Sequence, residues 1–345
     1  MSASEREEFI QLFHELKDDV LQILEQDLDM PQDAIEWIRE VMEYNCLGGK
    51  LNRGLLVVEC AKSLFGEELS PEIKRKANIL GWCIELVQAF FLIADDIMDN
   101  SLMRRGQICW YKLPKVELTA VNDAFLMESF VFRILRLHFR NEITYTDIIH
   151  LFQDTIHRTE MGQLLDLTSQ PLNAPSDLSR FTVERYRKIV RYKTAYYTFY
   201  LPLACAMLLR GILDEPSHQV AQDICMEIGE YFQIQDDFLD CFGDENVLGK
   251  VGTDIQDNKC SWLILQALDH ANDEQRELLK EHYGSSEEDS VAKVKELYKS
   301  LNLVGLYHDF ERETCTKINQ RIAQTDLMPP QVFKLMVEKI FKRSK

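Results

Sequence analysis

The sequence predicts an all-α fold, and three observations lead to this. Glycine and proline are scarce, with 14 and 9 in 345 residues, below their typical usage of about 7% and 5%. Apolar residues recur at helical spacing nearly throughout, and no stretch shows convincing strand alternation. Turn-forming residues divide the chain into segments that leave room for about ten or more helices joined by short loops. Since no linker, low-complexity tract or repeat interrupts them, residues 1–345 are predicted to form a single all-α domain.

The first helical segment shows the pattern, because Phe9, Phe13, Leu16 and Val20 lie on one face of a helix. Later segments are bounded by breaks at Asp29–Pro31, Leu47–Gly49, Gly66–Pro71, Gly106–Pro114, Pro171–Pro175, Asp214–Pro216, Gly243–Gly252, Gly284–Ser290 and Pro329–Pro330.

Two of these breaks are typical helix starts, with a capping side chain followed by a proline in the first turn: Ser70–Glu72 and Asp214–Pro216. The helices that they open are expected to run to about Asn100 and Cys241. The uncharged stretch from Thr194 to Leu209 is too short and too polar to span a bilayer. We therefore expect it to be a buried core helix.

The charge balance limits the classes of partner. A formal net charge of -18 would repel nucleic acid and anionic membrane surfaces, so we expect no nucleic-acid partner and no membrane insertion. The amino-terminal residues lack the features of a secretory signal or transit peptide, and the nine cysteines include no CxxC pair. These features predict a cytoplasmic protein with reduced thiols.

Two acidic pentads, DDIMD and DDFLD, are the strongest functional signal. Each would end a long helix and place its first and last aspartates one turn apart on the same face. Such clustered carboxylates repel one another unless cations neutralise them, and oxygen-only ligands favour magnesium. One pentad alone would be interpreted as a solvated helix face, but two in matching surroundings favour metal binding by Asp95, Asp96, Asp99, Asp236, Asp237 and Asp240.

Basic residues that could hold a phosphate group accompany the pentads. Arg104 and Arg105 follow the first, Lys250 and Lys259 follow the second, and the GGKLNRG turn carries two more cations, Lys50 and Arg53. The P-loop pattern GxxxxGK[ST] is absent, so nucleotide hydrolysis through that motif is not expected. Any one of these lysines taken alone would be interpreted as a solvated surface charge.

Five blocks, in order, carry a resemblance to a known family: GGKLNRG, LVQAFFLIADDIMDNSLMRRGQICWY, YKTAYYTFYLP, GEYFQIQDDFLDCFGD and GKVGTDIQDNKCSW. From about residue 9 onward the chain resembles the eukaryotic farnesyl diphosphate synthases, of the trans-prenyl diphosphate synthase family. The resemblance implies an all-α barrel of about ten core helices around a deep central cavity, and a homodimer. It also implies magnesium-dependent condensation of isopentenyl diphosphate with dimethylallyl diphosphate and then geranyl diphosphate, giving farnesyl diphosphate.

The resemblance also implies residue roles. Three magnesium ions, for which manganese is an alternative, would be bound by Asp95 and Asp99 (two ions) and Asp236 (the third), with support from Asp96, Asp237 and Asp240. The allylic diphosphate would be held by Arg104, Lys193, Lys250 and Lys259, and the allylic cation would be faced by Thr194, Gln233 and the carbonyl of Lys193. Isopentenyl diphosphate would be bound by Lys50, Arg53, Gln88 and Arg105. Gln163 and Asp166 either add to the allylic diphosphate site or belong to a plain helix face.

Phe90 and Phe91 precede Asp95 by five and four residues, so they lie roughly 6 to 8 Å deeper along the same helix. Aromatic pairs at such positions usually belong to a core, but the resemblance implies that these two form the cavity floor that limits product length. The carboxyl-terminal residues 341–345 resemble a basic tail that closes over the second substrate, and a frayed terminus is the equal alternative.

Three other functions are each compatible with part of this pattern. A geranyl or geranylgeranyl diphosphate synthase differs only near the first pentad. A terpene cyclase would carry an Asn/Ser/Glu type of second metal site, which DDFLD does not match. A non-catalytic regulatory subunit would be expected to have lost part of a metal motif, whereas both motifs are complete here.

Overall fold

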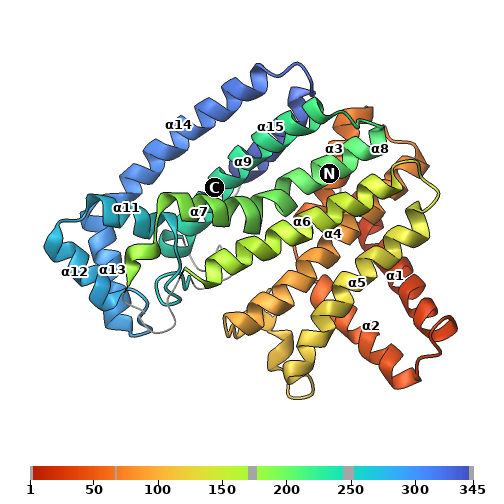
Figure 1. Cartoon of the computed structure of the whole chain (residues 1–345), viewed down its shortest axis with the longest axis horizontal. Helices are drawn as coiled ribbons and strands as arrows, with labels where there is room; N and C mark the ends of the chain where they lie inside the picture. Colours follow the sequence, from red (N-terminus) through yellow and green to blue (C-terminus); the bar gives the residue numbers. More distant parts are fainter. Residues whose placement is uncertain (1–2, 67, 170–176, 244–251, 342–345) are drawn as a thin grey trace. The chain divides into compact units, whose positions relative to one another are not determined.

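The computed structural model describes residues 3–66, 68–169, 177–243 and 252–341, with the side chain of residue 341 left out. Helices dominate these ranges (Figure 1), which confirms the predicted all-α class. The α-helices are Ala3–Gln26 (α1), Gln32–Cys46 (α2), Asn52–Phe65 (α3), Pro71–Met98 (α4), Ala120–Phe139 (α5), Tyr145–Leu167 (α6), Val183–Ile189 (α7), Leu201–Arg210 (α8), Glu215–Phe242 (α9), Trp262–His270 (α11), Asp273–His282 (α12), Glu288–Ser300 (α13), Leu303–Ala323 (α14) and Pro330–Phe341 (α15).

The chain divides into two compact units. The first unit comprises Met1–Asp154 and Leu201–His218, and the second comprises Thr155–Tyr200 and Gln219–Lys345. Helices α6 and α9 each contribute residues to both. The single-domain organisation stays a prediction.

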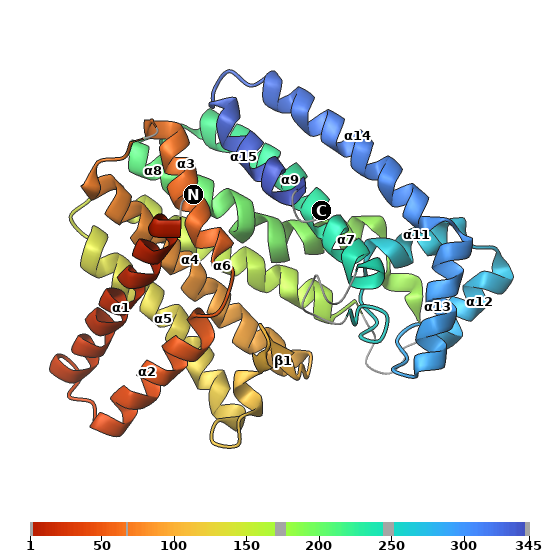
Figure 2. The same cartoon turned by 180° about the vertical axis from the view of Figure 1, so that it is seen from behind.

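Helix α4 is the centre of the first unit. It packs against α3, α5 and α8, and both α1 and α2 contact α4 and α5; Figures 1 and 2 show α1 and α2 side by side. Trp82 of α4 is fully buried, stacks on Phe9 of α1 with ring centroids 4.6 Å apart, and donates from its indole nitrogen to the Phe9 carbonyl (2.6 Å). Phe13 packs on the same ring.

The backbones of α3 and α4 touch where two glycines face each other. A Cβ atom on Gly81 would lie 2.5 Å from the carbonyl oxygen of Gly54, and one on Gly54 would lie 2.8 Å from that of Gly81. Both distances are shorter than a carbon–oxygen van der Waals contact, so the crossing has room only for glycine.

The second unit is built around the later turns of α6 and α9. Between them runs η4 (Val190–Tyr200), a π-helix. A Cβ on Gly162 of α6 would meet the Lys193 backbone nitrogen at 2.2 Å, and one on Gly229 of α9 would meet the Cβ of Ala195 at 2.3 Å. Two glycines therefore let η4 lie directly against α6 and α9.

The remaining helices of the second unit pack around its own hydrophobic core. Helix α13 contacts α11, α12 and α14, and α14 contacts α15; Figure 2 shows α11, α12 and α13 gathered together. In the core Phe238 stacks on Tyr307 with ring centroids 3.9 Å apart, and Trp262 and Tyr298 are buried with them.

Both predicted helix starts are confirmed. The Ser70 hydroxyl accepts from the Ile73 N–H (3.3 Å) at the start of α4. The Asp214 carboxylate accepts from the Ser217 N–H (2.9 Å) at the start of α9. The predicted core helix over 194–209 is buried along most of its length, as the end of η4 followed by α8. Helix α4 is long and apolar enough to cross a membrane, but 78% of its apolar window is buried within the protein.

A short β-hairpin differs from the sequence expectation. Strands Met103–Arg104 (β1) and Gln107–Ile108 (β2) pair antiparallel, with Met103 opposite Ile108. Arg105 and Gly106 between them have φ of 54° and 75°, as in the type I′ turns that suit hairpins. Two residues per strand are too few to show a period of two. Short 3-10 turns, Trp110–Lys112 (η1), Glu117–Thr119 (η2) and Leu178–Arg180 (η3), complete the described elements.

We expect Gly81→Ala to lower the free energy of unfolding by about 1 to 3 kcal/mol, because the new methyl group would overpack the crossing of α3 and α4. The loss should appear although alanine favours a helix over glycine by about 1 kcal/mol. Urea unfolding followed by circular dichroism measures it. Gly305→Ala is the matched control, since there only the end of the Asn302 side chain must move. Equal stability of Gly81→Ala and the parent protein would contradict this account.

Candidate active site

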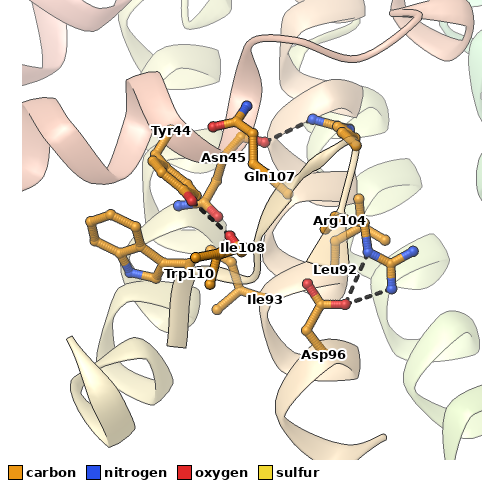
Figure 3. A pocket seen from close by; sticks show the side chains of 11 residues that line it. Tyr44, Asn45, Leu92, Ile93, Asp96, Arg104, Gln107, Ile108 and Trp110 are labelled. Carbon is orange, nitrogen blue, oxygen red and sulfur yellow. Dashed lines mark hydrogen bonds and ion pairs between the residues drawn. The ribbon is translucent and has the colours of Figure 1, made fainter. Parts of the chain in front are cut away.

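The first pentad ends α4, and its three aspartates have different surroundings. Asp96 is buried and accepts two hydrogen bonds from Arg104, at 2.9 Å from Nε and 2.5 Å from Nη2. Asp95 lies 3.9 Å from the same guanidinium group, and Asp99 caps the helix by donating its N–H to the Asp95 carbonyl (2.8 Å). Burial alone would lower the pKa of Arg104, but Asp96 and Asp95 outweigh it and raise that pKa. Figure 3 shows the Asp96–Arg104 pair.

The hairpin that carries Arg104 and Arg105 is held at its base by a buried carboxylate. Asp123 of α5 accepts from the indole nitrogens of Trp37 (2.9 Å) and Trp110 (2.8 Å) and is fully buried. The Tyr44 hydroxyl donates to the Ile108 carbonyl (2.6 Å). These bonds fix the hairpin to α2 and α5.

A small cavity lies between the hairpin and α4. Its lining includes Tyr44 and Asn45 of α2, Ile93 and Asp96 of α4, and Trp110, and Figure 3 shows these side chains around it. Its space of about 20 Å³ is enough for about one water molecule. The cavity therefore belongs to the packing around the Asp96–Arg104 pair.

The predicted isopentenyl diphosphate residues gather at the start of α3. Lys50 is exposed, Arg53 is half-buried, and the Gln88 amide is placed to accept from Arg53 Nη1 at 3.1 Å. Arg105 donates from Nη1 to the Asn45 carbonyl (3.0 Å). A Cβ on Gly49 would lie 2.8 Å from the Arg105 guanidinium carbon. The structure thus brings the guanidinium of Arg105 against the GGKLNRG turn.

Phe90 and Phe91 lie on α4 before the pentad, as their spacing requires. Their ring centroids are 4.5 Å apart with planes tilted by 43°. Phe90 is buried and Phe91 half-buried. The two rings therefore pack against each other within the first unit.

In the second pentad the middle aspartate, Asp237, is fixed by three hydrogen bonds. Asp237 is buried and accepts from the Tyr186 hydroxyl (2.7 Å), the Trp262 N–H (2.8 Å) and the Gln233 amide (2.9 Å). Burial raises the pKa of Asp237, and the neighbouring Asp236 also raises it, against the three hydrogen bonds. Asp236 and Asp240 are half-buried, and Asp240 Oδ2 accepts from the N–H of residue 254 (3.0 Å).

Two predicted residues on η4 point to partners in the second unit. The Thr194 hydroxyl donates to Gln233 Oε1 (3.0 Å), so the Thr194–Gln233 pair continues into Asp237. Lys193 Nζ lies 2.6 Å from Asp166 Oδ2, and Lys259 Nζ lies 3.4 Å from the same oxygen. One carboxylate therefore holds both lysines.

Asp166 is buried, which disfavours the alternative of a plain helix face. Burial alone would raise the pKa of Asp166, but the charges and hydrogen bonds of Lys193 and Lys259 outweigh it and lower that pKa. The carboxylate is therefore ionised at neutral pH and attracts both ammonium groups. The MGQLLDL segment was the only sequence signal for it.

The donors fit a hard divalent ion only in part. Asp95, Asp99 and Asp236 offer carboxylate oxygens, as magnesium prefers, whereas Asp96 and Asp237 are committed to the hydrogen bonds above. Among the described residues, no three His, Cys, Asp or Glu side chains gather closely enough to hold an ion by themselves. Lys250 and the tail at 342–345 lie outside the described residues, as does the side chain of Phe341.

Sequence reasoning missed two buried carboxylates, Glu85 and Asp123. Glu85 Oε1 accepts from the Gly54 N–H (2.8 Å), and Glu85 is only 2% exposed. Each lies inside a helix, and the partners Gly54, Trp37 and Trp110 are 13 to 86 positions away along the chain. No local pattern distinguishes them from the other acidic residues.

Residues 35–301 match the family model described as Polyprenyl synthetase. Farnesyl pyrophosphate synthase of Bos taurus is 49% identical over 348 residues, covering 99% of this chain and 97% of that protein; the Saccharomyces cerevisiae enzyme of the same name is 46% identical, covering 99% and 98%. The solved structure of T. brucei farnesyl diphosphate synthase complexed with risedronate is 36% identical, with a TM-score of 0.89 and 98% of both chains covered. The chain belongs to the polyprenyl synthetase family and, within it, to the eukaryotic farnesyl pyrophosphate synthases, prenyltransferases of isoprenoid biosynthesis.

Proposed function

We propose that the protein joins isopentenyl diphosphate head to tail with dimethylallyl diphosphate and then with geranyl diphosphate, releasing farnesyl diphosphate and diphosphate. The observation that carries the proposal is the pairing of acidic helix ends with phosphate-binding cations. Arg104 lies beside Asp95 and Asp96 in one unit, and Lys193 and Lys259 share Asp166 in the unit that carries DDFLD.

Magnesium is the proposed cofactor, as three ions held by Asp95, Asp99 and Asp236, with manganese as an alternative. When bound, these ions would neutralise the allylic diphosphate and make it a better leaving group. The sequence-based roles of Asp96, Asp237 and Asp240 as further ligands stay predictions. In the described geometry Asp96 and Asp237 instead orient Arg104 and Gln233.

The protein's own cations would hold the allylic diphosphate. Arg104 offers a planar fork of donors, and Lys193 and Lys259 offer ammonium groups, with Lys250 assigned by resemblance. Their charges stabilise the negative charge that develops on the departing oxygen as its bond to carbon breaks. The Thr194 hydroxyl and the Gln233 amide supply dipoles that suit the allylic cation without offering it a strong base.

Isopentenyl diphosphate would be bound by Lys50, Arg53, Gln88 and Arg105. Its double bond attacks the allylic cation, and the new carbon–carbon bond takes up the π electrons. A proton is then lost, and the released diphosphate is the proposed acceptor. The position of Arg53, Gln88 and Arg105 near the start of α3 supports a separate set of donors for this second diphosphate.

Incubation with isopentenyl diphosphate, magnesium and either dimethylallyl or geranyl diphosphate should yield a fifteen-carbon product by chromatography. We expect Asp95→Asn to lower kcat/KM by about a hundredfold or more, a loss of about 2.7 kcal/mol in transition-state stabilisation. Asp289→Asn, on the exposed surface of α13, is the control and should keep full activity. A ten- or twenty-carbon main product would instead indicate a geranyl or geranylgeranyl diphosphate synthase, and no product would indicate a non-catalytic subunit.

Shortening both Phe90 and Phe91 to alanine should let twenty-carbon or longer products accumulate, because the floor of the chain pocket would be lowered. Product length from the same substrates is the measurement. Leu327→Ala, at an exposed apolar position outside the proposed sites, is the control and should still give fifteen carbons. If the double variant kept the fifteen-carbon product, the floor assignment would be wrong.

We propose a homodimer that uses the outer face of α5. Val121 and Phe125 of α5 are 42% and 61% exposed, and their spacing of four residues puts them on one helical face. Leu118, in the adjoining 3-10 turn η2, is 71% exposed. Phe125→Asp should shift the protein toward the monomer in size-exclusion chromatography with light scattering, since a charge would then enter an apolar interface. Leu213→Asp, at another exposed apolar position, is the control. A parent protein that is monomeric at micromolar concentration would refute the proposal.

A further inference from the structure

Helix α3 begins without a capping side chain of its own. Its N-cap is Leu51, which has a left-handed backbone with φ of 56° and makes no capping hydrogen bond. The first four N–H groups of any helix lack acceptors within the helix, and Ser, Thr, Asp or Asn at the N-cap usually supplies one. The turn that carries Lys50 and Arg53 therefore needs an acceptor from elsewhere.

Glu85 of α4 supplies that acceptor from 31 positions along the chain. Its Oε1 accepts from the N–H of Gly54 at 2.8 Å, and Gly54 is the third residue of α3. This is the N–H that an N-cap side chain would usually satisfy. The carboxylate reaches it because Gly54 and Gly81 allow the two helices to touch.

The same carboxylate organises two of the proposed isopentenyl diphosphate residues. The Gln88 amide is placed to donate to Glu85 Oε2 (3.1 Å) while it accepts from Arg53 Nη1 (3.1 Å). Gln88 lies one turn after Glu85, on the same face of α4. With its amide in this orientation, Gln88 links Glu85, and through it the start of α3, to Arg53.

Glu85 also interacts electrostatically with Arg53 and Arg105. Burial raises the pKa of Glu85, and the Gly54 N–H and the guanidinium groups of Arg53 and Arg105 act in the opposite direction. Two arginines that face an anion site would repel each other, and the Glu85 carboxylate beneath them reduces that repulsion when it is ionised.

We propose that Glu85 is the positioning residue of the isopentenyl diphosphate site: it caps α3 and, through Gln88, fixes Arg53 toward the substrate. The proposal rests on the proposed function. Glu85 does not itself bind the substrate, because it is 2% exposed and a carboxylate would repel a diphosphate. Its effect should therefore be specific to one of the two substrates.

The test compares Glu85→Leu, which has no acceptor, with Glu85→Gln, which keeps one carbonyl oxygen. In Glu85→Leu we expect the KM for isopentenyl diphosphate to rise about tenfold or more, equal to about 1.4 kcal/mol, with the KM for geranyl diphosphate changed less than about twofold. Glu85→Gln should show a smaller rise. The control is Glu43→Gln, which removes a carboxylate paired with Lys17 in the same unit and should leave both KM values unchanged.

Hydrogen exchange gives a readout that is independent of turnover. Peptides over residues 47–58 should exchange faster in Glu85→Leu and keep their protection in Glu43→Gln, because only the first variant leaves the N–H of Gly54 without its acceptor. Should Glu85→Leu fail to fold, the partial KM change in Glu85→Gln decides.

Equal rises in both KM values, or unchanged KM for isopentenyl diphosphate, would overturn the positioning role. A parent protein that made no product would refute the proposed function instead. The Glu85 proposal would then be decided by titration calorimetry of isopentenyl diphosphate, with weaker binding to Glu85→Leu supporting it and equal binding overturning it.

Discussion

The close contact between Gly54 and Gly81 is the constraint on which the first unit's site depends. Because neither glycine has a Cβ, the backbones of α3 and α4 touch, and Glu85 comes within 2.8 Å of the Gly54 N–H. That bond fixes the start of α3. With its amide turned toward Glu85 Oε2, Gln88 also accepts from Arg53 and so positions it. A packing feature therefore sets the geometry of a charged site, through a carboxylate that the substrate would never touch.

In the second unit, too, glycines allow helices to approach closely and so position the side chains of the proposed site. Gly162 and Gly229 let the π-helix η4 lie against α6 and α9, and π-helical turns are often found at functional sites. Lys193 then reaches Asp166 of α6, while Thr194 reaches Gln233 of α9. Adjacent residues on one turn thus obtain different partners on opposite sides.

The aspartates of the two pentads differ in burial in the same way, which the motif itself does not predict. In each, the second aspartate is buried and hydrogen-bonded: Asp96 to Arg104, and Asp237 to Tyr186, Trp262 and Gln233. The first and last aspartates are only half-buried. Burying a carboxylate is costly unless donors surround it, so the middle position acts as an anchor and leaves the outer ones better placed for cations.

The helical class, the starts of α4 and α9, and the types of side chain at the site could be predicted from the sequence alone, because periodicity, capping residues and clustered charge are local patterns. Which carboxylates are buried, and which groups they bind, follows from the packing of the helices. Glu85 and Asp166 act on partners 31, 27 and 93 positions away, and the turn at Arg105 that aims the hairpin is too short to leave a pattern. Contacts over such separations depend on how helices cross, and this is fixed by the packing of the whole unit.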